Sequence, residues 1–214
     1  MIDPHTYLLF IGAAFVLVIA PGPDMAYMLA RTVAQGRAAG FLAAAGINAG
    51  AYVHVCASVV GLTAVLAASS FAFTVIKWAG AGYLVWMGYR ALTSKGEALK
   101  VEGAPTQKLR RRSIFWQGFW SDVLNPKVAI FFLAFLPQFV DVANETIGVT
   151  PQLLLLGVTC NVVAISTNLV LVCFAGAMTA RLRKSQRFVT WMHKAMGATF
   201  IALGLRLASQ RLET

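Results

Sequence analysis

The stretches Pro21-Gly22-Pro23-Asp24 and Asp122-Val123-Leu124-Asn125-Pro126-Lys127 each interrupt a long apolar run, one in each half of the chain. A proline inside a helix costs roughly 3 kcal/mol, because it removes a backbone hydrogen bond and clashes with the preceding turn. Lipid offers no water that could satisfy the freed backbone groups. Two such breaks at membrane depth therefore predict a polar cavity between broken helices, which is typical of secondary transporters.

The composition is that of a membrane protein. Of the 214 residues, 58% are hydrophobic and 12% are charged, and the mean hydropathy is +0.70; an ordinary soluble domain has roughly 25% charged residues. A transmembrane helix needs about 20 mostly apolar residues. Six such runs are present, at residues 7–30, 38–66, 71–92, 113–140, 149–176 and 189–208. We therefore expect an all-α polytopic protein with six transmembrane helices in a lipid bilayer.

The net charge of +10 comes from basic connections between the spans. The third connection holds Arg90, Lys95, Lys100, Lys108, Arg110, Arg111 and Arg112. The fifth holds Arg181, Arg183, Lys184 and Arg187, and no Lys or Arg occurs from Val128 to Ala180. The positive-inside rule places the basic connections in the cytoplasm and, with six spans, both termini outside it. Topology explains the charge better than nucleic-acid binding, so no nucleic-acid partner is expected.

The chain divides into two similar halves. Residues 94–112 form the most polar stretch and separate two sets of three spans, residues 1–93 and 113–214. Each set opens with the proline-broken span, and because three is an odd number, the second set must enter the membrane from the opposite side. The sequence predicts one membrane domain, residues 1–214, built as two inverted three-helix repeats. A basic cytoplasmic linker joins them, and the first and fourth helices are broken at mid-membrane.

Three charged residues, Asp24, Asp122 and Lys127, lie beside the breaks. A charge at the centre of a transmembrane helix costs roughly 2.5 to 3.5 kcal/mol. All three should therefore face the interior of the bundle. The structural alternative to a functional cluster is an ion pair between Lys127 and one of the carboxylates.

New half-helices are expected to begin at both breaks, because Gly22-Pro23 and Asn125-Pro126 have the residue types of an N-cap and a first helical position. Their free N–H groups favour a carboxylate, whereas Asp24 and the carbonyls of the preceding helix ends can receive an ammonium. A zwitterionic amino acid matches both poles; the alternative is that the prolines only kink packed helices. The predicted substrate-binding residues are Pro21, Gly22, Pro23, Asp24, Asn48, Asn125, Pro126 and Lys127.

Proton coupling is assigned to Asp24, Asp122 and His54, because His54 or a desolvated Asp could carry a proton. A lone histidine in a membrane helix is also a common structural hydrogen-bonding residue. Asn161 and Asn168 are further candidates for lining the cavity. Interhelical hydrogen bonding explains these asparagines equally well.

No cofactor, metal or disulfide is expected. Cys56, Cys160 and Cys173 lie inside apolar runs without CxxC spacing, which supports neither a disulfide framework nor a zinc site. No Ser-His or HExxH pattern appears within the spans, which argues against an intramembrane enzyme. The spacings Gly36-x-x-x-Gly40 and Gly46-x-x-x-Gly50 indicate close helix contacts, either within the chain or in a homodimer.

Four segments resemble the LysE/RhtB family of amino-acid exporters, which includes homoserine and threonine efflux proteins. They are "APGPDM", "QGRAAGFLAAAGINAGAYVH", "IKWAGAGYLVWMGYRAL" and "QGFWSDVLNPKVAIFFLAFLPQFV". The resemblance implies six spans in two inverted triplets in a bacterial inner membrane, with export driven by the proton motive force. It also implies that Pro21, Gly22, Pro23, Asn125, Pro126 and Lys127 occupy motif positions. Asp at position 24 is one of the residue types used there, since Asn also occurs.

The sequence therefore predicts an exporter and not an enzyme, which binds a small neutral amino acid between the two broken helices and alternates access across the membrane. Within the family, one branch favours homoserine, homoserine lactone, threonine and leucine, and another favours lysine or arginine. A homoserine- or threonine-like substrate is expected first, and a basic amino acid is the alternative. Export of an inorganic cation is disfavoured, because two buried carboxylates without a Cys or His cluster make a poor cation site.

Overall fold

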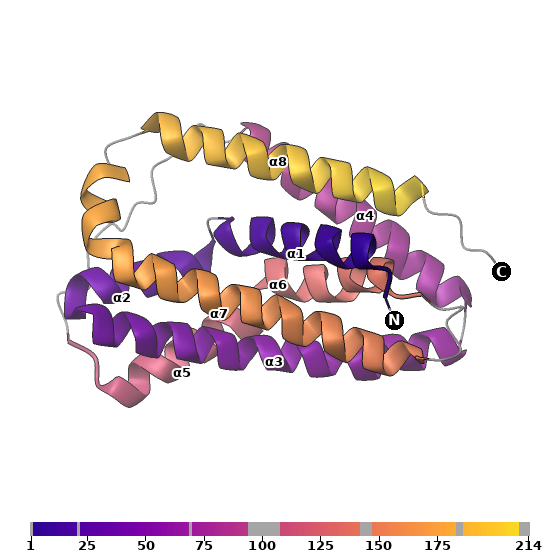
Figure 1. Ribbon diagram of the computed structural model, residues 1–214, viewed down its shortest axis with the longest axis horizontal. Helices are drawn as coiled ribbons and strands as arrows, with labels where there is room; N and C mark the ends of the chain where they lie inside the picture. The colour runs from indigo at the N-terminus through magenta and orange to yellow at the C-terminus, as the bar shows by residue number, and fades with distance from the viewer. Residues whose placement is uncertain are drawn as a thin grey trace.

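Every regular element of the part of the chain that the structure describes is a helix (Figure 1). The structure is a computed structural model that describes residues 2–20, 22–68, 70–93, 108–141, 147–182 and 186–209. Its elements are α1 (Pro4–Ile19), α2 (Pro23–Gln35), α3 (Arg37–Ala68), α4 (Ser70–Thr93), α5 (Arg111–Val123), α6 (Pro126–Ile130), the π-helical η1 (Phe131–Phe135), the 3₁₀-helical η2 (Leu136–Phe139), α7 (Val149–Leu182) and α8 (Gln186–Ser209).

Both predicted helix breaks are present. α1 and α2 are bent by 57° relative to each other, and α5 is bent by 46° from the segment formed by α6, η1 and η2. α2 begins at Pro23 with an extended Gly22 as its N-cap, and α6 begins at Pro126 with Asn125 as its N-cap. Proline suits the first helical position because its missing N–H would have no partner there anyway. Pro21 lies outside the described residues.

The described residues supply two to four candidate membrane spans. α3 and α7 are long and apolar enough to cross a membrane over Arg37–Ala64 and Val149–Ala175, and each bent pair can form one more span. α4 and α8 have 24 residues each, which at about 1.5 Å per residue exceeds a hydrocarbon core roughly 30 Å thick. The described part of the chain is thus all-helical and that of a multi-pass membrane protein, and the number six stays a prediction. Most of the predicted linker, residues 94–107, lies outside the described residues.

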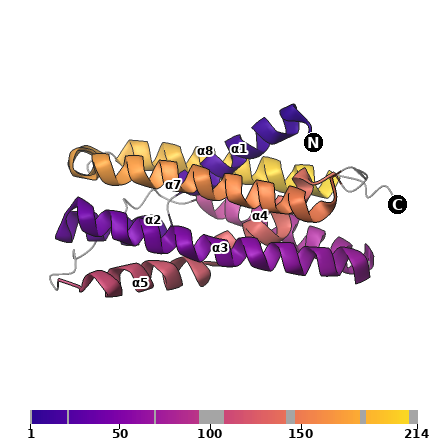
Figure 2. The same cartoon turned by 60° about the horizontal axis from the view of Figure 1, so that its bottom comes forward.

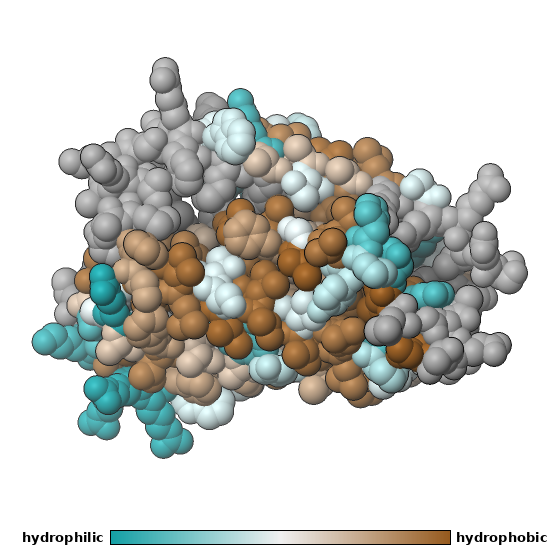
Figure 3. Space-filling model, in the orientation of Figure 1, coloured by the Kyte–Doolittle hydropathy of each residue, from teal (hydrophilic) through white to brown (hydrophobic). Residues whose placement is uncertain are grey.

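The helix ends gather at two ends of an elongated bundle (Figures 1 and 2). In Figure 1, α2, α4 and α7 end toward the left, where α3, α5 and α8 begin, whereas α1 begins and α8 ends on the right. By their places in these helices, Arg37, Arg90 and Arg111 belong to the left end, which we call the basic end. Figure 3 shows hydrophilic atoms over the start of α5 and a mostly hydrophobic surface along the bundle.

Glycines bring α3 and α5 into close contact. A Cβ at Gly46 would collide with the carbonyl oxygen of Phe115, and one at Gly50 would lie 2.7 Å from that of Phe119. A Cβ at Gly118 of α5 would equally meet the backbone of α3. The Gly46-x-x-x-Gly50 face is therefore used within the chain, as one of the two alternatives predicts. A homodimer stays a prediction.

α4 and α8, which the sequence predicts to be the third helices of the two repeats, pack along each other in a second close contact. A Cβ at Gly88 would lie 2.6 Å from the carbonyl oxygen of Gly197, and one at Gly197 would lie 2.7 Å from that of Gly88.

Gly36, between α2 and α3, is required for its backbone conformation, because it has a φ of 85°. This left-handed conformation favours glycine, and it ends α2 one residue before α3 begins.

A cluster of buried phenylalanines holds α1 against the segment that follows the second break. Phe10 of α1 meets Phe139 with ring centroids 5.2 Å apart, and Phe135 lies 4.8 Å from Phe139 and 4.7 Å from Phe131. All four rings are at most 3% exposed. This core lies between the breaks and the end of the bundle opposite the basic end, so it packs α1 against the segment formed by α6, η1 and η2.

The α3–α5 contact gives a first prediction. Gly46→Ala places a methyl group against a backbone carbonyl that cannot move aside, so we expect the free energy of unfolding to fall by about 1 to 3 kcal/mol. The midpoint of thermal unfolding of the purified protein in detergent measures this. The matched control is Gly61→Ala in the same helix, where a Cβ would meet nothing within 4 Å. Equal losses in the two variants would contradict the close contact.

Candidate functional site

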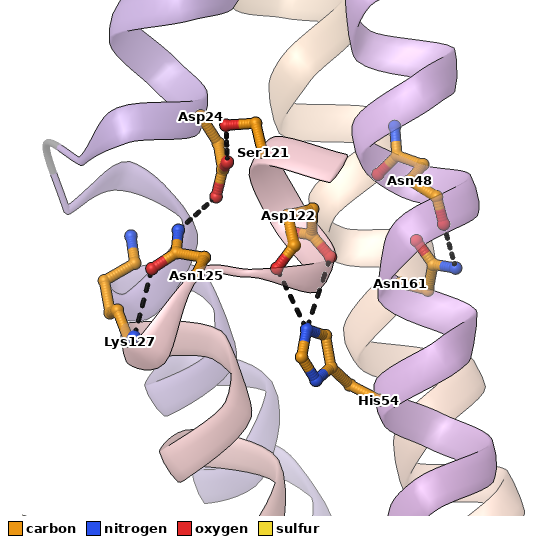
Figure 4. Close-up of polar contacts among 8 residues, drawn as sticks. All are labelled: Asp24, Asn48, His54, Ser121, Asp122, Asn125, Lys127 and Asn161. Carbon is orange, nitrogen blue, oxygen red and sulfur yellow. Dashed lines mark hydrogen bonds and ion pairs between the residues drawn. The ribbon is translucent and has the colours of Figure 1, made fainter. Parts of the chain in front are cut away.

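Asp24 joins the two breaks directly (Figure 4). It is buried in the first turn of α2, and both of its carboxylate oxygens accept hydrogen bonds from residues at the second break. Ser121 Oγ donates to Oδ1 over 2.7 Å, and Asn125 Nδ2 donates to Oδ2. Ser121 is a site residue that the sequence does not single out, and its place next to Asp122 is the signal that could have found it.

Asn125 serves both breaks at once. Its Oδ1 accepts a hydrogen bond of 3.0 Å from the backbone N–H of Lys127 and so caps α6, while its Nδ2 reaches Asp24. The backbone N–H can only donate, so this contact fixes which end of the amide carries the oxygen. The N-cap expected from the Asn-Pro pair is therefore also an interhelical contact.

Lys127 crosses from the second break to the end of α1. Its ammonium Nζ donates to the carbonyl oxygens of Leu17 and Ala20 over 3.2 and 3.1 Å. Both carbonyls lie at the C-terminal end of α1, where intrahelical donors run out, although the Leu17 carbonyl also accepts from the Ala20 N–H over 3.2 Å. A cation is favoured at this negative end of the helix dipole. No carboxylate of the described residues lies within 4 Å of this ammonium. The ion pair considered as an alternative is therefore not formed.

Asp122, near the end of α5, faces His54 of α3 (Figure 4). His54 Nε2 lies 3.0 Å from the backbone carbonyl of Asp122, and because a carbonyl only accepts, Nε2 carries the hydrogen. The same nitrogen lies 3.8 Å from Asp122 Oδ2, which is too long for a hydrogen bond. Oδ2 is buried without a hydrogen-bond partner. Two of the predicted proton-coupling residues are thus in contact, and Asp24 belongs to a separate network.

Asn48 and Asn161 join α3 to α7. Asn161 Nδ2 donates to the backbone carbonyl of Asn48 over 3.2 Å, and Asn48 Nδ2 donates to the carbonyl of Ala44 over 2.8 Å. Both amide oxygens are buried without a hydrogen-bond partner. The sequence leaves interhelical bonding and cavity lining as alternatives for these residues. The Asn161 amide nitrogen makes an interhelical hydrogen bond, whereas both amide oxygens stay available to a cavity.

These polar residues surround a cavity of about 60 Å³ between the breaks. Its polar lining is Asp24, Asn48, Asp122, Lys127, Asn161 and Asn168. Its apolar lining includes Leu17, Val18, Met25, Ile47, Ala51, Val128, Phe132, Cys160 and Ala164. The volume suits a few water molecules and is well below the roughly 300 Å³ at which ligand pockets begin. In this conformation the cavity is therefore too small for a ligand of ordinary size.

The other predicted site residues lie around this cavity rather than in its wall. Pro23, Asn125 and Pro126 line a groove on the outer face of the break, although the Asn125 side chain reaches inward. Gly22 lies against Lys127, whose Nζ would be 3.2 Å from a Cβ there. His54 reaches the site through Asp122. Among the described residues, no group of three His, Cys, Asp or Glu could hold a metal ion.

Polar contacts also hold α2 to α5 along the basic half of the bundle. Gln35 exchanges two hydrogen bonds of 3.0 Å with the backbone of Leu109, just before α5. Nearer the breaks, the Tyr27 hydroxyl donates to the carbonyl of Ile114 over 2.8 Å. At the start of α2, the hydrogen bond from Ser121 to Asp24 is a third contact between α2 and α5. α2 is therefore held to α5 and the residues just before it from the basic end to the breaks.

Known proteins resemble this chain over nearly its whole length. Residues 15–211 match the family model described as LysE type translocator. The chain is 26% identical to a leucine efflux protein of Klebsiella pneumoniae, covering 95% of this chain and 94% of that protein. It is 28% identical to an uncharacterized membrane protein of Vibrio cholerae (98% and 99% covered) and 30% identical to one of Pseudomonas aeruginosa (98% and 96%). No solved structure matches.

The Asp24 network gives a second prediction. Ser121→Ala removes a donor to a buried carboxylate, so we expect the free energy of unfolding in detergent to fall by about 1.5 to 3 kcal/mol. Ser113→Ala is the matched control, because Ser113 lies on the same helix and bonds only to the exposed Gln117 side chain, over 3.1 Å. It should change the value by about 0.5 kcal/mol or less. A loss in the control as large as that in Ser121→Ala would argue against the network.

Proposed function

Because the chain belongs to the LysE type translocator family, we propose that it exports a small neutral amino acid through the cavity between its two broken helices. The observation that carries this proposal is the charge around that cavity. The Lys127 ammonium and the start of α2 line the same cavity as the carboxylate of Asp122, and an amino acid has one charge for each. Membership of a translocator family makes the chain a transport protein and not an enzyme.

The apolar part of the lining supports an aliphatic substrate. Leu17, Ile47, Val128 and Phe132 are among the apolar residues that line the cavity and that a side chain of the substrate could meet. Such a surface favours a neutral over a basic amino acid, because it offers nothing to pair with a second positive charge. The relative named a leucine efflux protein makes leucine the first candidate. Threonine and homoserine, which the sequence resemblance suggests, come next.

For the topology we propose six spans in two inverted repeats, with the basic end in the cytoplasm of a bacterial inner membrane and both termini outside the cytoplasm. α2 and α5, the half-helices at the basic end, have 13 residues each. At about 1.5 Å per residue each is roughly 20 Å long, so both breaks would lie at a similar depth. The close contact between α4 and α8 also supports this topology, because in the proposed repeats these are the third helix of each half.

The transport cycle we propose is a rocking of one repeat against the other around the cavity. Opening toward the basic end would break the contacts of Gln35 with Leu109 and of Tyr27 with Ile114, because these contacts hold α2 to the first part of the second half on that side. Opening toward the other end would separate α1 from α7, which are joined by a 2.7 Å hydrogen bond between Tyr7 and Thr159.

Proton coupling is assigned to Asp122 together with His54. Asp122 keeps one oxygen without a hydrogen-bond partner beside the cavity, and His54 touches the same residue. Histidine changes charge near neutral pH and is a common proton carrier. Asp24 is the weaker candidate of the three predicted residues, because Ser121 and Asn125 already occupy both of its oxygens.

The proposed function predicts transport by the purified protein in lipid vesicles. An imposed pH gradient should drive leucine in the direction opposite to the proton flow. His54→Gln keeps a donor toward the Asp122 carbonyl but cannot carry a proton at neutral pH. It should lower gradient-driven movement by about tenfold or more and leave leucine–leucine exchange in place. If no neutral amino acid moves, the proposed function is wrong; if His54→Gln behaves like the parent, the role of His54 is wrong.

Alternating access predicts that locking α2 to the start of α5 stops transport. In a protein whose Cys56, Cys160 and Cys173 are replaced by Ala, Gln35→Cys and Leu109→Cys are introduced together and joined by a short thiol-reactive cross-linker. Leucine exchange in vesicles should then cease, because the basic end cannot open. The two single-cysteine variants, treated with the same reagent, are the controls and should stay active. Full exchange in the cross-linked protein would show that this end does not need to separate.

A further inference from the structure

Three buried oxygen atoms around the cavity have no hydrogen-bond partner. They are Oδ2 of Asp122, Oδ1 of Asn48 and Oδ1 of Asn161. The three residues are 3%, 7% and 1% exposed and come from α5, α3 and α7. A buried acceptor without a partner costs about 1 to 3 kcal/mol, and one such atom could be incidental. Three around one cavity indicate a site built to receive donors.

The orientation of both amides is fixed by their own hydrogen bonds. Asn48 Nδ2 donates to the carbonyl of Ala44, and Asn161 Nδ2 donates to the carbonyl of Asn48. Because carbonyl oxygens only accept, neither amide can be turned around without losing its contact. Figure 4 shows both amide oxygens pointing toward the side on which Asp122 lies. The set therefore presents acceptors only.

The other two charged residues at the cavity, Lys127 and Asp24, already have hydrogen-bond partners elsewhere. The Lys127 ammonium is bound to the end of α1 and has no carboxylate within 4 Å. Asp24 has both oxygens engaged by Ser121 and Asn125. Of the two carboxylates in the cavity wall, Asp122 is thus the one with an oxygen left for a ligand.

We propose that Asp122, Asn48 and Asn161 together bind the α-ammonium group of the transported amino acid. An ammonium has three N–H donors and no acceptor, and three oxygens carrying one negative charge match it in number and sign. The inference rests on the proposed function and deepens it, because it assigns the positive pole of the substrate to Asp122 and not to Asp24. The substrate carboxylate is left for the start of α2 and Lys127, which line the same cavity; in Figure 4, Lys127 lies on the side of Asp122 away from Asn48 and Asn161.

The test compares ligands that lack one pole each. L-leucine carries both charges, L-leucinamide keeps the ammonium without the carboxylate, and 4-methylpentanoate keeps the carboxylate without the ammonium. Their dissociation constants for the full-length protein in detergent come from the ligand-induced rise of the unfolding midpoint. The variants are Asp122→Asn, Asn161→Ala and, as a matched control on the same helix, Ser166→Ala. Ser166 is exposed and bonds only to its own helix, at the carbonyl of Val162.

In Asp122→Asn and Asn161→Ala, the dissociation constants of leucine and leucinamide should rise by about tenfold or more, whereas that of 4-methylpentanoate should stay within about twofold. Ser166→Ala should match the parent for all three ligands. An equal loss for all three ligands, or no loss for leucinamide, would overturn the ammonium site. So would a leucine affinity that depends on Na⁺ in the parent and not in the variants, because the oxygens would then hold a metal ion. If the parent protein binds no neutral amino acid, with threonine and homoserine tried beside leucine, the proposed function itself fails, and the ammonium site with it.

Discussion

A helix that breaks inside a membrane exposes backbone groups that water cannot reach, so the protein itself must supply their partners. Here each break supplies hydrogen-bond partners for the other. Lys127, from the second break, donates to the last carbonyls of α1, and Asn125 caps α6 while also binding Asp24 of the first break. The polar site at the centre of the bundle follows from this exchange, because a break left alone in lipid would be too costly to keep.

The exchange depends in turn on how closely α3 approaches α5. Gly46 and Gly50 put the backbone of α3 against that of α5, and a Cβ at Gly50 would lie 3.0 Å from the Cβ of Asp122. His54 follows Gly46 and Gly50 at the same four-residue spacing along α3, so its side chain lies on the glycine face and meets Asp122 near the end of α5. Close packing and the contact with Asp122 therefore share one face of α3. A larger residue there would move the site as well as destabilise the bundle.

The three charges at the breaks have separate tasks. Lys127 completes a helix end, Asp24 ties two segments together, and Asp122 keeps an oxygen without a partner beside the cavity. The sequence places all three in one site but does not divide these tasks, and it leaves open an ion pair that the structure does not form. The division depends on which partner each side chain can reach. That in turn depends on the rotation of each helix about its axis.

The sequence by itself determined the helical membrane class, the two breaks, the N-caps at Gly22 and Asn125, and the concentration of basic residues in particular connections between the spans. These features follow from local properties of the chain, namely hydropathy, the missing N–H of proline and the reach of a capping side chain. The tertiary structure alone decided the partners. Ser121 binds Asp24 across 97 residues, His54 binds Asp122 across 68, and Asn161 binds Asn48 across 113. A contact between helices depends on their separation and rotation, which close packing at the glycines sets and local sequence does not.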